Sequence, residues 1–339
     1  MNPTLNSQLG TCLLLLSLLT QLTIAQDFRR RDPERIHDPS TVYTENKEYY
    51  FFSTGHGVSL IKEQDDGRWT RTARVFEQEN LPAWHKEKVP ANRGHLWAPD
   101  VIKLKDTYYL YYSVSSFGKQ TSAIGIAAGK TLDPKSPDWG WKDQGPVITS
   151  DKSKPFNAID PALFKDDDGS LWMSWGSFWN GLYLAQLDPK TGKLLDPKNK
   201  PTKLAWSAKI EAPFIHKRDG YYYLFVNHGL CCQGVNSTYD IRVGRSKKIT
   251  GPYLDQDKVD LKDGGGTLLL ETDGDRIGPG HASILKRNGR EFLAYHYYSK
   301  PHRGSSRFAL APLTWEKGWP VIDDLAENPP SKKTNQAPE

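Results

Sequence analysis

Five stretches of the chain share one order of polar and apolar positions. Each begins with a polar residue, usually beside proline, and continues with a short apolar run, a polar turn and a second run rich in aromatic residues. Short aromatic and β-branched runs that are separated by turn residues are typical of antiparallel strands. The pattern therefore predicts strand pairs in residues 37–53, 98–113, 159–177, 210–228 and 280–298, whereas a helical period is nearly absent.

The polar residues that begin these units recur at similar intervals. They are Asp38, Asp100, Asp160, Glu211 and His281, separated by 62, 60, 51 and 70 residues. Units of this length, each with one supersecondary pattern, fit the four-stranded blades of a β-propeller. The sequence therefore predicts an all-β fold, a five-bladed β-propeller. A series of hairpins in a β-sandwich is the alternative, because turns recur there too.

The composition favours strands and turns over helices. The 339 residues are 12% aromatic and include 28 glycines and 23 prolines, which are residue types of strands and turns. The net charge is only +5, and no basic run extends beyond Arg29, Arg30 and Arg31. We therefore expect no nucleic-acid partner.

The first 26 residues differ from the rest of the chain. They carry no charged side chain and include the run CLLLLSLL at residues 12–19, which predicts a secretory signal peptide over residues 1–26. A membrane anchor is the alternative, although the run is short for a span. We expect a secreted or periplasmic protein with no membrane contact after signal removal, a propeller over residues 27–320 and a polar tail over residues 321–339.

The cysteines offer little to hold a fold together. Cys12 lies in the predicted signal peptide, and Cys231 and Cys232 are neighbours, so a disulfide framework is impossible. A bridge between adjacent cysteines is geometrically demanding, and we expect none. Two adjacent thiols without further cysteines also make a poor metal site.

Equivalent positions of the inner strands of a propeller form a ring at one mouth of its channel, and here that ring would hold several carboxylates. Two carboxylates across a gap suit glycosidic hydrolysis, because one protonates the leaving oxygen while the other activates water. Aromatic side chains near the repeats would give a sugar ring an apolar surface: Trp97, Phe117, Trp175, Phe178 and Trp179. Alternatively, the acidic residues beside proline begin turns, His281 is a hydrogen-bonded structural histidine, and Trp175 and Trp179 are blade core.

Eight motifs, in order, carry a family resemblance. They are HDPS at 37–40, HLWAPDV at 95–101, SSFGKQTSAIG at 115–125, NAIDPALF at 157–164, WGSFW at 175–179, IEAPF at 210–214, CCQGVNSTY at 231–239 and GPGHAS at 278–283. From about residue 34 to 315 the chain resembles glycoside hydrolase family 43, and within it most closely the arabinan endo-1,5-α-L-arabinosidases.

The resemblance implies a five-bladed propeller that acts with inversion. Asp38 would be the general base, Glu211 the general acid, and Asp160 the residue that orients the acid and tunes its pKa. His281 would lie beside a metal ion, usually calcium, which is coordinated largely by water. Asp100 matches no catalytic position and is expected to be structural. The residues that would line the sugar subsites are His37, Trp97, Phe117, Gly118, Asn157, Ser177, Phe178 and Trp179.

The substrate implied by the resemblance is arabinan, the α-1,5-linked side chain of pectin, and we expect endo cleavage by a monomer. Exo cleavage is an alternative that depends on the rim loops at residues 54–95 and 299–308. An α-L-arabinofuranosidase or β-xylosidase of the same family is another. A non-catalytic sugar-binding propeller is disfavoured, because Asp38, Asp160 and Glu211 are all present.

Overall fold

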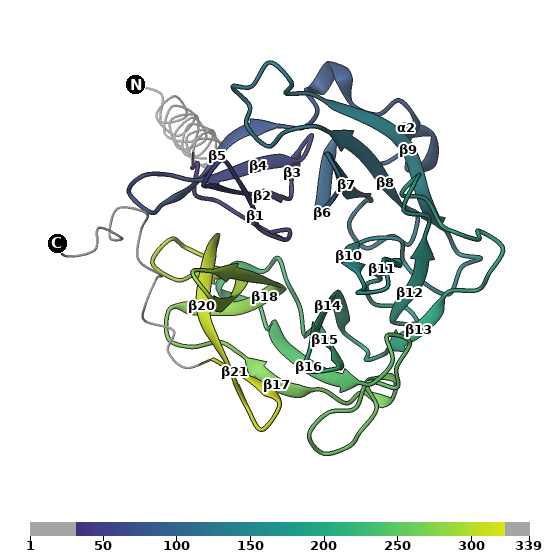
Figure 1. The fold of residues 1–339 in the computed structure, drawn as a ribbon, viewed down its shortest axis with the longest axis vertical. Coiled ribbons are helices and arrows are strands. Elements are labelled where there is room, and N and C mark those ends of the chain that lie inside the picture. Colours follow the sequence, from purple (N-terminus) through teal and green to yellow (C-terminus); the bar gives the residue numbers. More distant parts are fainter. Residues whose placement is uncertain (1–31, 323–339) are drawn as a thin grey trace, which may run out of the picture.

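The computed structural model describes residues 32–322, which form five antiparallel sheets around a central axis (Figure 1). The predicted five-bladed β-propeller is therefore confirmed. The expected signal peptide at 1–26 lies outside the described residues, as does all of the expected tail except Val321 and Ile322. These two residues belong to the last strand, so the propeller extends two residues past its predicted end.

Four blades are four-stranded sheets built from consecutive segments. Blade 1 contains β1 (Tyr43–Glu45), β2 (Glu48–Ser53), β4 (Ser59–Glu63) and β5 (Trp69–Arg74). Blade 3 contains β10 (Ala162–Lys165), β11 (Leu171–Trp175), β12 (Leu182–Leu187) and β13 (Thr202–Ala205). Blade 4 contains β14 (Ile210–Arg218), β15 (Tyr221–His228), β16 (Asp240–Ser246) and β17 (Thr267–Leu270). Blade 5 contains β18 (Arg276–Arg287), β19 (Arg290–Ser299), β20 (Ser305–Glu316) and β21 (Trp319–Ile322).

Blade 2 has a fifth strand, which comes from a segment between two strands of blade 1. Its sheet joins β3 (Gly55–His56) to β6 (His95–Leu104), β7 (Thr107–Val114), β8 (Ser122–Gly129) and β9 (Trp141–Ser150). The two residues of β3 lie between β2 and β4 in the chain but pair with β6. Helical structure within the described residues is limited to α2 (Trp84–Lys88) and to the 3-10 turns η1 (Gln78–Asn80), η2 (Gly234–Asn236) and η3 (Leu261–Asp263).

The tight turn between β14 and β15 shows how the sequence sets the strand register. Arg218 pairs with Tyr221, so only Asp219 and Gly220 form the turn. Both have positive φ, 49° and 73°, which is the backbone of a type I′ turn and explains why an Asp-Gly pair closes this hairpin. The register of β15 then places Tyr223 and Phe225 in the packed layer towards blade 5.

The hydrophobic core consists of five clusters, one at each junction between neighbouring blades. At the junction of blades 2 and 3, Trp175 is fully buried and packs edge-on against Phe156, with the ring centres 5.4 Å apart. Trp175 therefore belongs to the core and is not a surface for a sugar ring.

Side-chain packing closes the ring between blades 5 and 1. Phe51 and Ile61 of blade 1 pack with Leu285 and Phe292 of blade 5. β1 pairs with β2, and β21 pairs with β20, so within residues 32–322 no strand is exchanged between the first and last blades. The same stretch contains no helix long and apolar enough to cross a membrane.

Candidate active site

One residue in each inner strand, or up to five residues before it, has an unusual backbone, and we call it the head residue. The head residues are Asp38, Ala98, Asp160, Ala212 and His281, with φ of 52°, 38°, 58°, 53° and 59°. Positive φ is uncommon for residues other than glycine and concentrates at functional sites. The register of the sequence repeat was therefore wrong in two blades. Glu211 precedes its head residue by one position, and Asp100 follows its own by two.

Asp100 lies below the ring of head residues and joins three blades. Its carboxylate accepts hydrogen bonds from the backbone N–H of Thr41 in blade 1, at 2.9 Å, and of Leu163 in blade 3, at 2.7 Å. Burial raises the pKa of Asp100 to about 6, although these two donors favour the ionised form. The contacts agree with the structural role expected for this residue.

Side chains of the neighbouring blades hold the head residues in place. The backbone N–H of each head residue donates to a side chain of the preceding blade. The pairs are Ala98 with Thr54 Oγ1 (2.8 Å), Asp160 with Ser113 Oγ (3.0 Å), Ala212 with Asp160 Oδ2 (3.2 Å), His281 with Asn227 Oδ1 (2.8 Å) and Asp38 with His296 Nδ1 (3.1 Å). Every blade junction therefore fixes part of the site.

Sequence reasoning missed four of these acceptors, namely Thr54, Ser113, Asn227 and His296. A signal was present, because each lies within the aromatic run of its blade or no more than two residues after it. In blade 3 the run ends in Gly176, five residues after Leu171, which pairs with the end of the inner strand. Glycine has no side chain to offer, and the carboxylate of Asp160 holds the next head residue instead.

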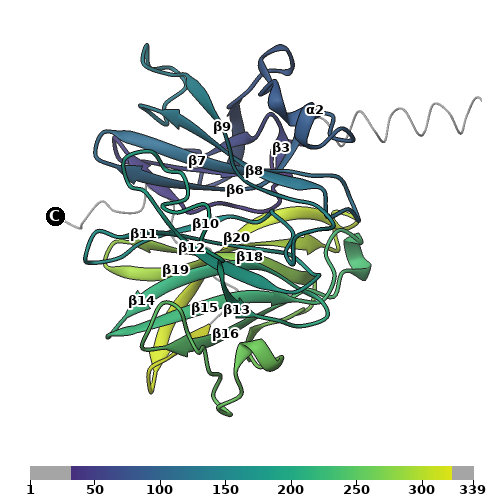
Figure 2. The ribbon, with the colours of Figure 1, turned by 90° about the vertical axis from the view of Figure 1, so that its right-hand side faces the viewer.

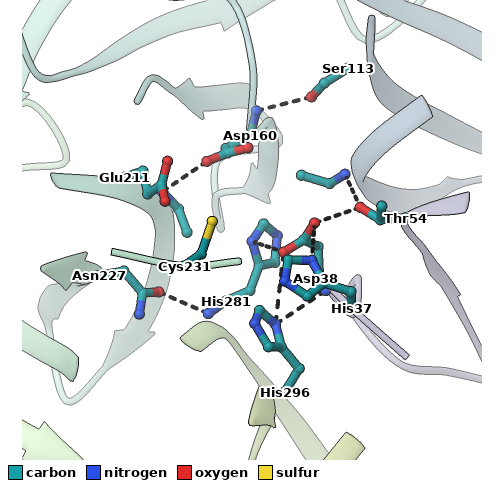
Figure 3. A network of polar contacts seen from close by, with 12 residues as sticks. His37, Asp38, Thr54, Ser113, Asp160, Glu211, Asn227, Cys231, His281 and His296 are labelled. Carbon is teal, nitrogen blue, oxygen red and sulfur yellow. Dashed lines mark hydrogen bonds and ion pairs between the residues drawn. The ribbon is translucent and has the colours of Figure 1, made fainter. Parts of the chain in front are cut away.

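Asp38 lies in a pocket of hydrogen-bond donors (Figure 3). Its Oδ2 accepts from Thr54 Oγ1 at 2.5 Å and lies 2.8 Å from His37 Nδ1, and its Oδ1 lies 3.6 Å from His281 Nδ1. Burial opposes ionisation, but the combined effect of His37, His281 and His296 outweighs it. The pKa of Asp38 is therefore lowered well below the usual range, and the carboxylate is ionised.

A hydrogen-bonded chain holds the ring of His37 against Asp38. Tyr298 Oη accepts from the backbone N–H of Cys232 at 2.7 Å and lies 2.7 Å from His37 Nε2. An ionised carboxylate only accepts, so His37 Nδ1 carries a proton and donates it to Asp38 Oδ2. His37 thus stabilises the ionised form of Asp38 by donating a hydrogen bond to it.

Glu211 has the opposite environment. It is buried, and its Oε2 accepts one side-chain hydrogen bond, from Ser177 Oγ at 2.6 Å. Burial raises the pKa of Glu211 to about 7; Ser177 opposes this shift and the charge of Asp38 adds to it. Burial and the neighbouring Glu211 also raise the pKa of Asp160 well above its usual value. Asp38 is thus set to be ionised and Glu211 to hold a proton.

The donor atoms around His281 test whether a calcium ion fits there. Calcium takes six to eight oxygen ligands, and the nearest charged neighbour of the His281 ring is the Asp38 carboxylate. Within the described part of the chain, the His, Cys, Asp and Glu atoms close enough to share an ion are those of His37, Asp38 and His296. This set is rich in nitrogen and omits His281. A calcium ion beside His281 would therefore need water for most of its ligands.

The two adjacent cysteines are joined by a disulfide, so the expectation that they are unbridged was wrong. Cys232 has positive φ, 67°, in a turn that brings both sulfur atoms together. Cys231 points into the space between Glu211 and His281 (Figure 3), and Cys232 Sγ lies 3.9 Å from His37 Nε2. The disulfide is therefore part of the wall of the site.

The residues expected to contact sugars fall into two groups. His37 and Ser177 bond directly to the two carboxylates described above, and Asn157 is buried with an unpartnered Oδ1. The others are partly or largely exposed to solvent. Trp97, whose Nε1 donates to His95 Nδ1 at 2.9 Å, and Phe178 are half-buried, and three residues lie in exposed loops: Phe117 (80% exposed), Gly118 and Trp179 (43% exposed).

Comparison with known proteins places this site in a family. Residues 33–320 match the model of glycosyl hydrolases family 43. The chain is 43% identical over 303 residues to the extracellular exo-α-(1→5)-L-arabinofuranosidase of Cellvibrio japonicus, covering 85% of this chain and 86% of that protein. It is 40% identical over 295 residues to the extracellular endo-α-(1→5)-L-arabinanase 1 of Bacillus subtilis, covering 85% and 87%.

A solved structure agrees with these matches. The α-L-arabinanase of Cellvibrio cellulosa in complex with arabinohexaose superposes with a TM-score of 0.81 at 41% identity, covering 86% of this chain and 96% of that one. The family match spans nearly all of the described propeller, including the head residues and both carboxylates with opposed environments. The chain is therefore a glycosidase that belongs to glycosyl hydrolases family 43.

Proposed function

We propose that this enzyme hydrolyses the α-1,5-linked L-arabinofuranosidic bonds of arabinan with inversion. The observation that carries the proposal is the contrast between Asp38 and Glu211. Hydrogen bonds keep Asp38 ionised, while burial keeps Glu211 protonated up to about pH 7. Environments that push the pKa values of two carboxyl groups apart separate the base from the acid. The names of the arabinan-cleaving relatives support the choice of substrate.

Each carboxyl group has one role in a single displacement. Asp38 takes a proton from a water molecule as that water attacks the anomeric carbon, and Glu211 gives its proton to the departing glycosidic oxygen. Afterwards Asp38 is protonated and Glu211 ionised, and exchange with solvent restores both. Asp160 acts as a positioning residue, because it holds the backbone N–H of Ala212, next to Glu211.

The sugar subsites are proposed from the residues around these carboxyl groups. The exposed rings of Phe117 and Trp179 offer apolar faces for arabinose rings, with Trp97, Gly118 and Phe178 beside them. Nearer the reacting bond, His37 and Ser177 hold the carboxyl groups, and the unpartnered Oδ1 of Asn157 is a buried acceptor for a sugar hydroxyl.

We propose endo cleavage, with exo cleavage as a second candidate because the C. japonicus relative, at 43% identity, is named as exo-acting. The test is to digest linear arabinan and follow product sizes with time. Endo cleavage yields oligomers of mixed length from the start. A single short product from the first minutes would show exo cleavage, and the absence of any product from arabinan would overturn the proposed substrate.

Three further proposals concern the setting of the enzyme. A calcium ion beside His281, held mainly by water, would supply positive charge close to Asp38; isothermal titration with calcium, before and after His281→Ala, tests it. Secretion is supported by relatives named extracellular and is tested by comparing medium with cell extract. The expected monomer is tested by light scattering.

A further inference from the structure

The mouth of the channel opposite the catalytic site carries its own repeat. Five residues after the head residue, four inner strands have a lysine: Lys103, Lys165, Lys217 and Lys286. The strands run across the molecule from one face to the other (Figure 2). Five residues of strand span roughly 16 Å, so the lysines lie at the far mouth from Asp38 and Glu211.

Three of these lysines line a cavity of about 420 Å³. Blades 1, 3, 4 and 5 all contribute to it, with Lys165, Lys217 and Lys286 beside an apolar wall of Val42, Phe164, Ile284 and Leu285. This volume lies in the range of small-molecule sites. A wall that is partly apolar and partly cationic suits a ligand with one apolar face and a negative charge.

Among the described residues, the ion pairs around the cavity leave the ammonium group of Lys165 unpaired and that of Lys286 in an exposed pair. Lys217 is held by Asp166 at 2.5 Å and by Asp167 at 2.9 Å. Lys286 lies 3.3 Å from Glu291 but is 70% exposed, and Lys165 forms no ion pair with any residue between 32 and 322. Asp167 is the single acidic residue in the cavity lining, which also includes the imidazole ring of His216.

We propose that this cavity binds a carboxylate-bearing saccharide, a uronate unit of an acidic polysaccharide. The apolar face of the sugar ring would pack on Phe164 and Ile284, and its carboxylate would lie between Lys165 and Lys286. The proposal goes beyond the hydrolytic function and does not depend on it. The enzyme would hold an acidic polymer at one mouth while the other mouth cleaves a neutral chain.

Calorimetric titration of the full chain with trigalacturonate tests this site. We expect saturable binding that weakens with added salt and falls at least about tenfold in the double variant Lys165→Ala/Lys286→Ala. Lys103→Ala is the matched control, because Lys103 shares the register but does not line the cavity; its affinity should stay within about twofold of the parent. Hydrolysis of linear arabinan should be unchanged in all variants, which reports that they are folded.

Several results would overturn the proposal. Absence of saturable binding, or equal affinity in the double variant, would remove the site. Equal affinity for arabinotriose would show that the carboxylate is not recognised. Equal affinity for inorganic phosphate would show a general anion site without selection for a sugar ring. Loss of arabinan hydrolysis with trigalacturonate binding retained would instead concern only the proposed catalytic function.

Discussion

Asp160 Oδ2 accepts a hydrogen bond of 3.2 Å from the backbone N–H of Ala212, the residue that follows Glu211. The two acids are therefore coupled both through the backbone and through charge. Asp160→Asn keeps an oxygen acceptor for Ala212 but removes a neighbouring carboxyl group. Because burial and the charge of Glu211 raise the pKa of Asp160, Asp160 is still protonated when Glu211 ionises. Asp160→Asn should therefore leave the pH above which kcat/KM declines nearly unchanged. Asp160→Ala should lower kcat, since the backbone contact is lost. A clear shift of that pH in the Asn variant would contradict this order of ionisation.

Replacement of the proposed acid should abolish cleavage of poor leaving groups. Glu211→Gln keeps an acceptor for Ser177 but cannot donate the proton, so kcat on arabinan should fall by about 10²–10⁴-fold. An aryl arabinofuranoside whose phenol needs no protonation should lose much less. The matched control is Glu79→Gln, which changes an exposed residue of η1 and should leave both rates unaltered. An equal loss on both substrates would argue against proton donation by Glu211.

The pH dependence of kcat/KM follows from the two environments. Glu211 must be protonated to act, and its pKa is about 7, so kcat/KM should fall about tenfold per pH unit above that value. Asp38 must be ionised, and its pKa lies well below the usual aspartate value of about 3.9. The acidic limb should therefore lie below that value, provided that the fold survives. Initial rates with a short arabino-oligosaccharide measure both limbs, and a basic limb near pH 4 or 5 would contradict the assignment.

A buried ion pair should stabilise the closure of the ring. Arg287 of blade 5 and Glu63 of blade 1 meet at 2.9 Å, with side chains 5% and 3% exposed. Arg287→Met leaves the Glu63 carboxyl group buried without its partner, so the free energy of unfolding should fall by about 3–5 kcal/mol. The exposed pair Lys88–Glu87, at 2.7 Å, is the control, and Glu87→Gln should cost less than about 1 kcal/mol. Urea titration measures both; similar effects in the two variants would contradict a special role for the closure.

Reduction of the disulfide should lower kcat, although the disulfide is separate from the carboxyl groups of Asp38 and Glu211. The Cys232 backbone N–H bonds Tyr298, which bonds His37, which faces Asp38. If a thiol reductant loosens this chain, kcat should fall by roughly tenfold, as small misplacements of reacting groups do. The double variant Cys231→Ala/Cys232→Ala should show the same loss and no further response to the reductant. Full activity in the reduced enzyme would show that the chain holds without the disulfide.

The parts of this molecule that repeat could be predicted from the sequence. Five strand pairs with aromatic second strands predicted the propeller, and the motifs around Asp38, Asp160 and Glu211 predicted the carboxyl groups that the structure brings together. The exact ring positions could not be predicted, because irregular pairing between Trp97 and Asp100 and between Glu211 and Phe214 shifts the register. A β-bulge of this kind adds a residue without changing the pattern of residue types.

Contacts between blades were the other part that the sequence did not reveal. Asn227 holds His281, and His296 holds Asp38, across 54 and 258 residues of chain. No local spacing links such pairs. The disulfide between Cys231 and Cys232 depends on one left-handed residue, which residue type alone does not indicate. By contrast, the core position of Trp175, at the end of the second strand of blade 3, was one of the two interpretations of that residue.

The short strand β3 sets the order in which the chain can become structured during synthesis. Blade 1 emerges from the ribosome first, but Gly55 and His56 find their partners only when Leu96 and His95 have followed. The Thr54 hydroxyl, beside β3, likewise bonds both Asp38 and the N–H of Ala98. Asp38 therefore acquires its final surroundings only after the second blade has begun to form. We expect a nascent chain that stalls before residue 95 to expose an unfinished first blade and to be recognised by chaperones.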